Sequence, residues 1–425
     1  MSKLISISLS PNVEKEDVLL ALKLLFSPWK RMKGKAILEL EEEFKKYLGT
    51  KYAFSFNSGR SSLMAILNSL GLMDGDEVLL QAFTCNAVAN PIIWSGLKPV
   101  YIDCDEKTFN IDVEDLEKKI SSKSKAVIIQ HTFGLPADID EILEVCRQNN
   151  LILIEDCAHS LGAEYKGKKV GTFGKASFFS FSRDKVISSV YGGMVATDDD
   201  KLAGRIQEYQ EKIGYPHYLW SCQQLLHPVL MNWLILPTYK SIGKYLFVLF
   251  QELNILSKAV SLKEKRGERP NYFPKRMQNA LAVLALNQLK KLERFNNHRR
   301  EIASFYYEEL KGTSFKLPVD PEDRKQNFLR FTLKHEKAHE IIEKFWDKNV
   351  LIGDWYTTPI APDYNKLEKI KHGRDLRPAS ENMGYKLGSC PVAERLAKET
   401  FNLPTHINVS KEEAKKIVEF LRQWK

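Results

Sequence analysis

The sequence predicts an α/β protein with a mainly parallel sheet and a smaller C-terminal α+β domain. Short apolar runs alternate with amphipathic helical stretches over the first half of the chain, which is typical of strands joined by crossover helices. After about residue 270 the pattern changes to long helices with few strands. A chain of 425 residues is also longer than a single hydrophobic core normally supports.

Seven apolar runs bounded by turn residues are the predicted strands of the sheet. They are residues 52–56, 77–81, 99–102, 126–130, 151–155, 176–181 and 193–196. Helices are predicted where apolar residues recur every three or four positions, as in SSLMAILNSL, DVEDLEKKI and DIDEILEVCRQ. Because parallel sheets bind ligands at the carboxyl ends of their strands, the residues after each strand are the candidates for chemistry.

We expect three regions along the chain: an N-terminal segment over 1–35, a large α/β domain over 36–262 and a small α+β domain over 263–425. The small domain is predicted to begin with long helices in MQNALAVLALNQLKKLERFNNHRREIASFYYEELKG. Short strands around 328–333 and 350–352 and a final helix over 411–424 follow.

An apolar insertion at about 215–262 interrupts this pattern. Residues 213–239 carry no formally charged side chain. Pro228 and Pro237 break the stretch, and Lys240 and Lys244 follow before the roughly 20 apolar residues that span a bilayer accumulate. The insertion therefore predicts a buried or subunit-facing helical segment, and a peripheral membrane or partner-protein contact is the alternative.

Composition narrows the functional class. The net charge of +9 comes from 63 Lys and Arg against 54 Asp and Glu, with both signs scattered; this suits a small anionic substrate better than a nucleic acid. Six cysteines without a CxxC pair predict reduced thiols and no zinc site. The N-terminus has no export signal, so a cytoplasmic protein is expected.

The first candidate site segment is FNSGRSSL, which joins a predicted strand to a helix. Ser58, Gly59, Arg60 and Ser61 stand where the helix begins. Free backbone N–H groups at a helix start, together with hydroxyl groups, can hold a phosphate. A plain N-cap and turn is the alternative.

Two later segments add a carboxylate and a lysine. Asp156 ends a predicted strand and His159 follows, while Ser180 lies at the end of another strand and Lys185 on the loop after it. A strand-end carboxylate can keep a heterocyclic nitrogen protonated, although capping of a neighbouring helix is the alternative. A loop lysine is usually solvated and inert. A phosphate cradle, an aspartate and a lysine in this order are nevertheless the parts of a pyridoxal phosphate site.

A fourth segment places Phe83 and Cys85 at a strand end, where they could cover a flat cofactor ring. Packing of a crossover loop is the alternative and is favoured for Phe83.

Many motifs in order and spacing resemble one known family. They include GKAILELEEEFKKYLGTKYA, NSGRSSL, FTCNAV, GLKPVYIDCD, HTFGLPADIDEI, IEDCAHSLGAEYKGKKVGTFG, SFFSFSRDK, GGMVATDD and FNLPTHINVS. The chain resembles the DegT/StrS family of pyridoxal-phosphate-dependent aminotransferases, which act mainly on nucleotide-linked keto-sugars. The resemblance implies the fold type I architecture of PLP-dependent transferases, built here on a seven-stranded sheet, with pyridoxal 5′-phosphate as cofactor.

The resemblance also implies residue roles. Lys185 would be the Schiff-base lysine that also moves the substrate proton, and Asp156 would pair with the pyridinium nitrogen. His159 would lie near the cofactor ring. The phosphate would be held by Gly59, Arg60, Ser61 and Ser180.

Three positions depart from the family pattern. Cys85 stands where an aromatic residue commonly stacks on the ring, and Tyr191 replaces the usual Glu before the glycine pair. In RPNYFPKRM, Asn271 is the counterpart of an asparagine that family members present to the phosphate of the partner subunit.

The resulting prediction is a homodimeric aminotransferase with ping-pong half reactions. An amino donor, expected to be glutamate, gives its amino group to a keto-sugar nucleotide; lysine rather than histidine at 185 favours transamination over dehydration. The alternatives are a PLP- or PMP-dependent sugar dehydratase, a cyclitol aminotransferase, and a non-catalytic PLP-binding regulator or scaffold.

Overall fold

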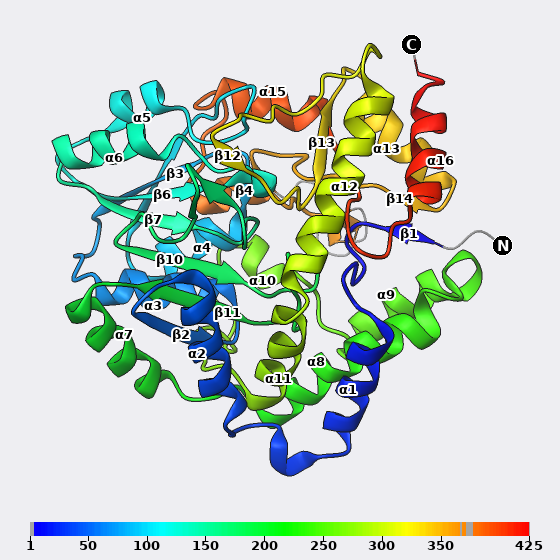
Figure 1. Cartoon of the computed structure of the whole chain (residues 1–425). Helices are drawn as coiled ribbons and strands as arrows, with labels where there is room; N and C mark the ends of the chain where they lie inside the picture. Colours follow the sequence, from blue (N-terminus) through cyan, green and yellow to red (C-terminus); the bar gives the residue numbers. More distant parts are fainter. Residues whose placement is uncertain (1–3, 366–367, 371–376, 425) are drawn as a thin grey trace.

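A seven-stranded sheet lies at the centre of the computed structural model of the chain (Figure 1), which describes residues 4–365, 368–370 and 377–424. In the order in which they pair, its strands are β2 (Tyr52–Phe56), β11 (Gly193–Thr197), β10 (Ala176–Ser180), β7 (Ile152–Asp156), β6 (Ser124–Gln130), β3 (Glu77–Gln81) and β5 (Lys98–Ile102). Every predicted strand is confirmed, with ends that differ by one or two residues.

The sheet is mainly parallel, as predicted. Strand β11 alone runs antiparallel to both of its neighbours, β10 and β2, and the other neighbouring pairs are parallel. In register, Asp156 on β7 pairs with Gln130 on β6 and with Phe178 on β10. The carboxyl ends of these central strands therefore open on one edge of the sheet.

Helices cover both faces of the sheet. They are α2 (Ala36–Leu48), α3 (Gly59–Ser69), α4 (Asn86–Trp94), α5 (Val113–Lys119), α6 (Ile139–Gln148) and α7 (Asp200–Ile213). Side chains on a strand alternate between faces, so β6 sends Val127 and Ile129 into one apolar core and Ala126 and Ile128 into another. The predicted helices at 61–70, 112–120 and 138–148 are confirmed as α3, α5 and α6.

The C-terminal part contains the long helices, short strands and last helix that the sequence predicts. Its elements are α11 (Asn279–Leu289), α12 (Leu292–Leu310), β12 (Arg324–Lys325), β13 (Phe331–Lys334), α13 (Ala338–Asp347), β14 (Val350–Leu351), β15 (Ile360–Ala361), α15 (Pro391–Glu399), β16 (Thr400–Leu403) and α16 (Lys411–Leu421). Strand β13 pairs antiparallel with β16, a partner that the sequence did not reveal. A third apolar core forms between α12, α13, α16 and these strands.

Short pairings tie distant parts of the chain to one another. The N-terminal β1 (Ile5–Ser6) runs parallel to β14, and β4 (Thr84–Cys85) runs parallel to β15. The hairpin of β8 (Glu164–Tyr165) and β9 (Lys168–Lys169) adds β12 at its edge. The N-terminal segment and the C-terminal part therefore both reach the edge where the central strands end.

The apolar insertion folds into helices that pack beside the N-terminal helix α1 (Lys15–Leu25) (Figure 1). Its elements are α8 (Tyr218–Leu230), two π-helical turns at Met231–Ile235 and Tyr239–Gly243, α9 (Lys244–Glu252) and the short α10 (Leu262–Lys265). Met231, Ile235 and Leu256 are buried together. The predicted helices are therefore present in the insertion, whereas its burial is limited, since α9 has no buried residue.

The outer side of the insertion is apolar as well. Ile242, Tyr245, Leu249 and Leu253 are 48–66% exposed and recur at helical spacing. Among the described residues, no helix combines the length and the apolar character needed to cross a bilayer.

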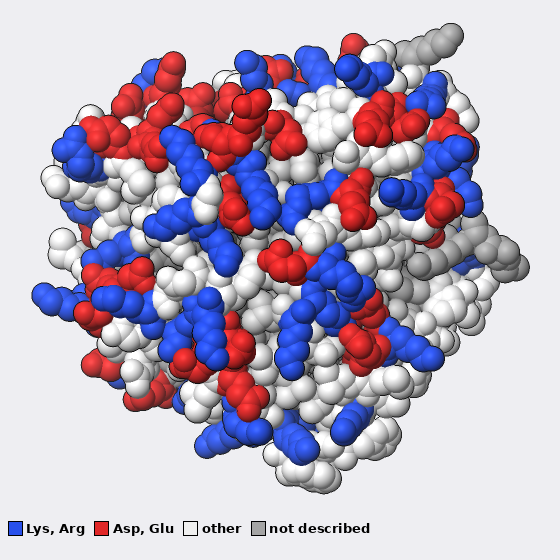
Figure 2. All heavy atoms as spheres, in the orientation of Figure 1, with Lys and Arg blue, Asp and Glu red and all other residues white. Residues whose placement is uncertain are grey.

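Charges of both signs lie side by side over the face shown in Figure 2. Ion pairs are also found at the surface of the molecule: Lys166 contacts Asp140 at 2.5 Å, and Lys325 contacts Glu164 at 3.0 Å. The excess of Lys and Arg is thus not gathered into one basic patch on this face.

Candidate active site

A cavity of about 620 Å³ opens at the carboxyl edge of the sheet, a size that suits a small-molecule site. Its walls come from the start of α3, the ends of β7 and β10, the loop after β10, the end of the apolar insertion and residues 354–362. Seven of the eleven predicted site residues line it: Gly59, Arg60, Cys85, Asp156, His159, Ser180 and Lys185.

Lys185 presents its amine inside this cavity. The residue follows β10, and its backbone N–H donates to the Ser182 carbonyl at 3.1 Å. Its side-chain nitrogen lies 4.6 Å from the centre of the Trp355 ring. Burial lowers the pKa of the Lys185 amine, because a charged ammonium is disfavoured away from water. The position therefore favours a neutral, nucleophilic amine.

Asp156 places its carboxyl at the end of β7, on the same cavity. Its Oδ1 accepts a hydrogen bond from the Ala158 backbone N–H at 2.9 Å. Burial raises the pKa of this carboxyl to about 6, although the Ala158 bond and the positive charge of Lys185 oppose the shift. A cationic ring nitrogen beside the carboxyl would lower the pKa again, so the site suits a protonated heterocycle.

His159 is a buried, oriented ring. Its Nδ1 accepts from the Phe133 backbone N–H at 3.3 Å, which assigns the ring proton to Nε2. That atom lies 3.4 Å from the Tyr356 hydroxyl. The ring also stacks on Trp355, with centroids 5.3 Å apart. Burial lowers the pKa of His159 well below its usual value, so the imidazole is neutral.

The start of α3 has the form of a phosphate cradle. Ser58 caps the helix by accepting the Ser61 backbone N–H at 3.1 Å. A Cβ on Gly59 would lie 3.1 Å from the Ser180 Cβ, and one on Gly193 would lie 2.5 Å from the Ser58 backbone. The two glycines thus let β10, β11 and the helix start approach closely, which brings the Ser180 side chain next to the free N–H groups of the helix.

Arg60 lines the cavity, and its guanidinium group is bound by residues 259 and 264. Its Nε lies 2.5 Å from the Glu264 carboxylate in a buried pair, and its Nη2 donates to the Ala259 carbonyl at 3.0 Å. The guanidinium also lies over the Phe273 ring. A role of Arg60 in phosphate binding stays a prediction, and the contacts observed tie α3 to α10 and the end of the insertion.

Four predicted site residues do not line the cavity. Ser58 and Ser61 lie behind its wall, where Ser61 donates to the Asn57 side chain at 2.6 Å. Phe83 is fully buried and packs against Phe109, Phe133 and Tyr356. These contacts fit the packing of a crossover loop that was favoured for Phe83, and a contact of Phe83 with the cofactor stays a prediction. Asn271 is exposed, and it is not part of this chain's own cavity.

Sequence reasoning missed the contribution of the C-terminal part. Trp355 and Tyr356 enter the cavity from a loop, and Arg330 stacks on the Trp355 ring with its guanidinium carbon 3.3 Å from the ring centre. Arg330 also lies 3.7 Å from the Asp184 carboxylate, beside Lys185. The strand predicted at 350–352 ends just before Trp355, but its pattern did not indicate that the loop after it enters the cavity.

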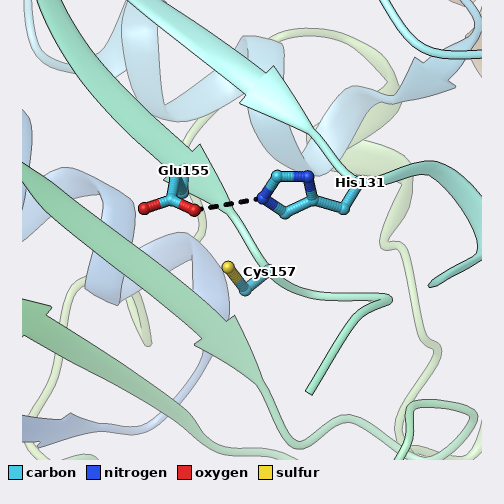
Figure 3. A group of neighbouring side chains, drawn as sticks. All are labelled: His131, Glu155 and Cys157. Atoms are coloured by element: carbon cyan, nitrogen blue, oxygen red, sulfur yellow. Dashed lines mark hydrogen bonds and ion pairs between the residues drawn. The ribbon is translucent and has the colours of Figure 1, made fainter. Parts of the chain in front are cut away.

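A buried cluster of His131, Glu155 and Cys157 lies at the ends of β6 and β7 (Figure 3) and contains potential metal ligands. Glu155 already accepts three backbone N–H groups from residues 171–174, and it pairs with His131 Nε2 at 3.2 Å. The other ring nitrogen of His131 accepts the Ala137 N–H. Burial raises the pKa of the Cys157 thiol, which keeps its proton. The Glu155 and His131 atoms that could bind a metal are therefore engaged in hydrogen bonds that hold the fold together.

Comparison with known sequences decides the family. The sequence pattern of the DegT/DnrJ/EryC1/StrS aminotransferase family matches residues 11–217 and 260–422. The chain belongs to this family. It is an aminotransferase, and the resemblance in the sequence motifs is confirmed. The unmatched residues, 218–259, lie within the apolar insertion.

Two similar relatives and two solved structures extend the comparison. The chain is 29% identical over 408 residues to GDP-perosamine synthase of Escherichia coli O157:H7, covering 94% of this chain and 93% of the relative. It is 27% identical over 403 residues to dTDP-3-amino-3,6-dideoxy-alpha-D-galactopyranose transaminase of Aneurinibacillus thermoaerophilus, covering 95% and 93%. The fold matches DesV of S. venezuelae with a TM-score of 0.72 and 24% identity, covering 96% of this chain and 94% of that one. The fold also matches PseC of Helicobacter pylori, with a TM-score of 0.72 and 23% identity, and the match covers 99% of each chain.

The cofactor of DegT/DnrJ/EryC1/StrS aminotransferases is pyridoxal 5′-phosphate, and the cavity fits it. The Lys185 amine, whose pKa burial lowers, the Asp156 carboxyl and the cradle between α3 and Ser180 match its aldehyde, ring nitrogen and phosphate. The fold is that of the solved sugar aminotransferases, as the resemblance implied.

Proposed function

We propose that the chain transfers the amino group of an amino acid, glutamate in the first instance, to a keto-sugar carried on a nucleotide. The observation that carries the proposal is the meeting of the Lys185 amine, the Asp156 carboxyl and the α3 helix start in one cavity. The sugar acceptor rests on the relatives, whose names describe enzymes of GDP- and dTDP-linked amino sugars. The donor becomes a 2-oxo acid and the acceptor carbonyl becomes an amine.

Each group of the site has a part in this reaction. When bound, pyridoxal phosphate supplies an aldehyde carbon that carries the amino group and a ring that withdraws electrons. Lys185 would hold the cofactor through its side-chain amine and would move the proton at the substrate carbon. Asp156 holds the ring nitrogen protonated, and Ser180 with the start of α3 binds the phosphate.

The aromatic side chains keep the site dry and ordered. Trp355 lies over the Lys185 amine and stacks on His159, while Cys85 closes the wall at the start of α4. Exclusion of water strengthens the electrostatic pairing at Asp156. The thiol at Cys85 keeps its proton because burial raises its pKa.

The absorption spectrum of the purified protein tests the proposal. We expect a visible band from cofactor bound to lysine, which borohydride bleaches, leaving the pyridoxyl mass on Lys185 alone. Glutamate should convert the band, and a nucleotide-linked keto-sugar should restore it. Lys185→Ala should lower turnover by at least about 10²–10⁴-fold, whereas Lys175→Ala removes only an exposed pair with Asp199 and should not. Turnover of Lys185→Ala at the rate of the unmodified protein would refute the assignment.

We also infer a homodimer in which Asn271 reaches the partner's phosphate site. Its exposure outside this chain's cavity supports the arrangement. Light scattering should give twice the mass of one chain, and mixing Lys185→Ala chains with Asn271→Ala chains should leave one intact site in each mixed dimer. A monomer with full activity would contradict this inference.

A further inference from the structure

The insertion that the family pattern does not match forms part of the cavity wall. Helix α9 contributes Val248, Gln251 and Glu252, and the chain that follows contributes Lys258 and Ala259. The matched regions of the family end at residue 217 and resume at residue 260. This wall therefore comes from a segment that the family pattern does not match.

The wall is fixed to the catalytic part of the site through backbone contacts. Arg183 donates to the Ser257 carbonyl at 2.8 Å and to its hydroxyl at 2.9 Å. The Tyr191 hydroxyl donates to the Lys258 carbonyl at 2.7 Å, and Arg60 donates to the Ala259 carbonyl. Tyr191, which departs from the family pattern, thus contacts the insertion directly.

Among the cations that line the cavity, Lys258 differs in its pairing. Arg60 is paired with Glu264 at 2.5 Å and Lys265 with Glu368 at 2.6 Å, and all four side chains are at most 9% exposed. The pair between Lys258 and Glu252 is 2.9 Å long, but these side chains are 35% and 42% exposed. A pair in contact with water contributes little free energy and exchanges partners readily. Lys258 can therefore take an anionic ligand in place of Glu252.

We propose that the insertion binds the acceptor substrate, with Lys258 on its diphosphate and Gln251 and Glu252 on the hydroxyl groups of its sugar. On binding, phosphate oxygens replace the Glu252 carboxylate at the Lys258 amine. The released Glu252 carboxylate accepts hydrogen bonds from the sugar hydroxyl groups, and the Gln251 amide both donates and accepts them. This inference rests on the proposed function, since it names the part of the chain that recognises the nucleotide-linked sugar.

Calorimetric titration of the holoenzyme tests the assignment. The probes are GDP-mannose, dTDP-glucose and UDP-N-acetylglucosamine, each compared with the free nucleoside diphosphate. Lys258→Met should weaken both kinds of probe by roughly tenfold or more, because a hydrogen bond to a charged group is lost. Gln251→Ala should weaken only the sugar-bearing probes, by several-fold. Glu252→Gln should strengthen the binding of the free nucleoside diphosphates, because the carboxylate that competes for Lys258 is removed.

Lys244→Met provides the matched control. Lys244 is an exposed cation at the start of the same α9 and does not line the cavity, so probe affinity should stay unchanged. Equal losses in Lys244→Met and Lys258→Met would reduce the effect to general electrostatics and overturn the proposal. Unchanged affinities in Lys258→Met would overturn it as well. If Gln251→Ala lost as much affinity for the free nucleoside diphosphates as for the nucleotide sugars, the contact between Gln251 and the sugar would be refuted.

The outcome also separates this inference from the proposed function. If the unmodified holoenzyme binds none of the probes and aminates no nucleotide-linked keto-sugar, the sugar acceptor itself is wrong. If it binds and aminates them while the wall variants behave as the unmodified protein does, only the role of the insertion is refuted.

Discussion

The side-chain nitrogen of Lys185 lies 4.6 Å from the centre of the Trp355 ring. The two residues are far apart in the sequence: Lys185 follows a strand of the central sheet, and Trp355 precedes β15. Trp355 nevertheless packs against the apolar core that contains Val186 and Ile187. The indole removes water from the amine and presents its electron-rich face to it. Burial lowers the pKa of Lys185, although the negative charges of Asp184 and Asp156 oppose the shift.

The pH dependence of cofactor attachment follows from this balance. Only the neutral amine attacks an aldehyde, so the rate at which apoprotein takes up pyridoxal phosphate should rise with pH. Because burial lowers the pKa of Lys185, the half-maximal rate should fall below pH 10.5, the ordinary value for lysine. Stopped-flow absorbance between pH 6 and pH 11 measures the profile. A midpoint at or above 10.5 would contradict the burial of the amine.

Replacement of Trp355 should move that midpoint. Trp355→Ala admits water to the amine, so the pKa of Lys185 should rise towards its ordinary value and the profile should shift to higher pH. Trp355→Phe keeps an aromatic face and should shift it less. The same stopped-flow titration compares the three proteins. Equal midpoints in the unmodified protein and in Trp355→Ala would mean that other residues exclude water from the amine.

The buried pair of Glu155 and His131 should be a stability element rather than a catalytic one. Burial alone raises the pKa of Glu155, but the hydrogen bond and charge of His131 and the backbone N–H groups lower it overall. Glu155→Gln places an amide among N–H donors and should cost about 2–4 kcal/mol in unfolding free energy. Urea unfolding measures the loss, with Glu144→Gln, an exposed pair, as a control expected within about 0.5 kcal/mol.

The sign of the pH effect at Glu155 is also fixed. A carboxyl whose folded pKa lies below 4.5 stabilises the fold above that pH and loses its contribution as the pH falls through the folded value. The difference between the unmodified protein and Glu155→Gln should therefore be constant near pH 7 and shrink in acid. A difference that grows on acidification would contradict the pairing.

Much of the fold was predictable because its signals are local. Each strand of the central sheet is a short apolar run, and the carboxyl edge where Asp156 and Ser180 end their strands follows from parallel pairing alone. The start of α3 was also readable, since Ser58 is an N-cap by residue type and observed geometry. The sequence alone was therefore enough to assign the residues that end or follow these strands to the carboxyl edge of the sheet.

The rest depended on contacts between distant segments. Trp355 and Arg330 reach the Lys185 loop from the C-terminal part, and no pattern within ten residues of either predicts the meeting. Phe83 shows the converse: its place after a strand suggested a cofactor contact, but three aromatic neighbours enclose it behind the wall. The pocket wall formed by α9 was equally hidden, because an apolar insertion predicts burial but not the surface that it covers.

The N-terminal segment should act as a support for the catalytic lysine. The side-chain amide of Asn12 donates to the carbonyls of Lys185 and Val186, and its oxygen accepts from Arg299 at 2.9 Å. Arg299 is fully buried and also donates to the Val186 carbonyl at 2.9 Å. Burial lowers the pKa of Arg299 to about 9, so the network loses charge only well above neutral pH.

Asn12→Ala should remove this support and leave Arg299 short of an acceptor, at a cost of about 1–3 kcal/mol in unfolding free energy. If Asn12 positions the lysine, the pH midpoint of cofactor attachment should also move and kcat should fall more than KM changes. Asn149→Ala is the control, because that side chain bonds only to the Val145 carbonyl on α6 and should leave the midpoint unchanged. If Asn12→Ala lost stability but kept the pH midpoint of cofactor attachment, Asn12 would have a purely structural role. Its hydrogen bonds would then stabilise the fold without orienting the Lys185 amine.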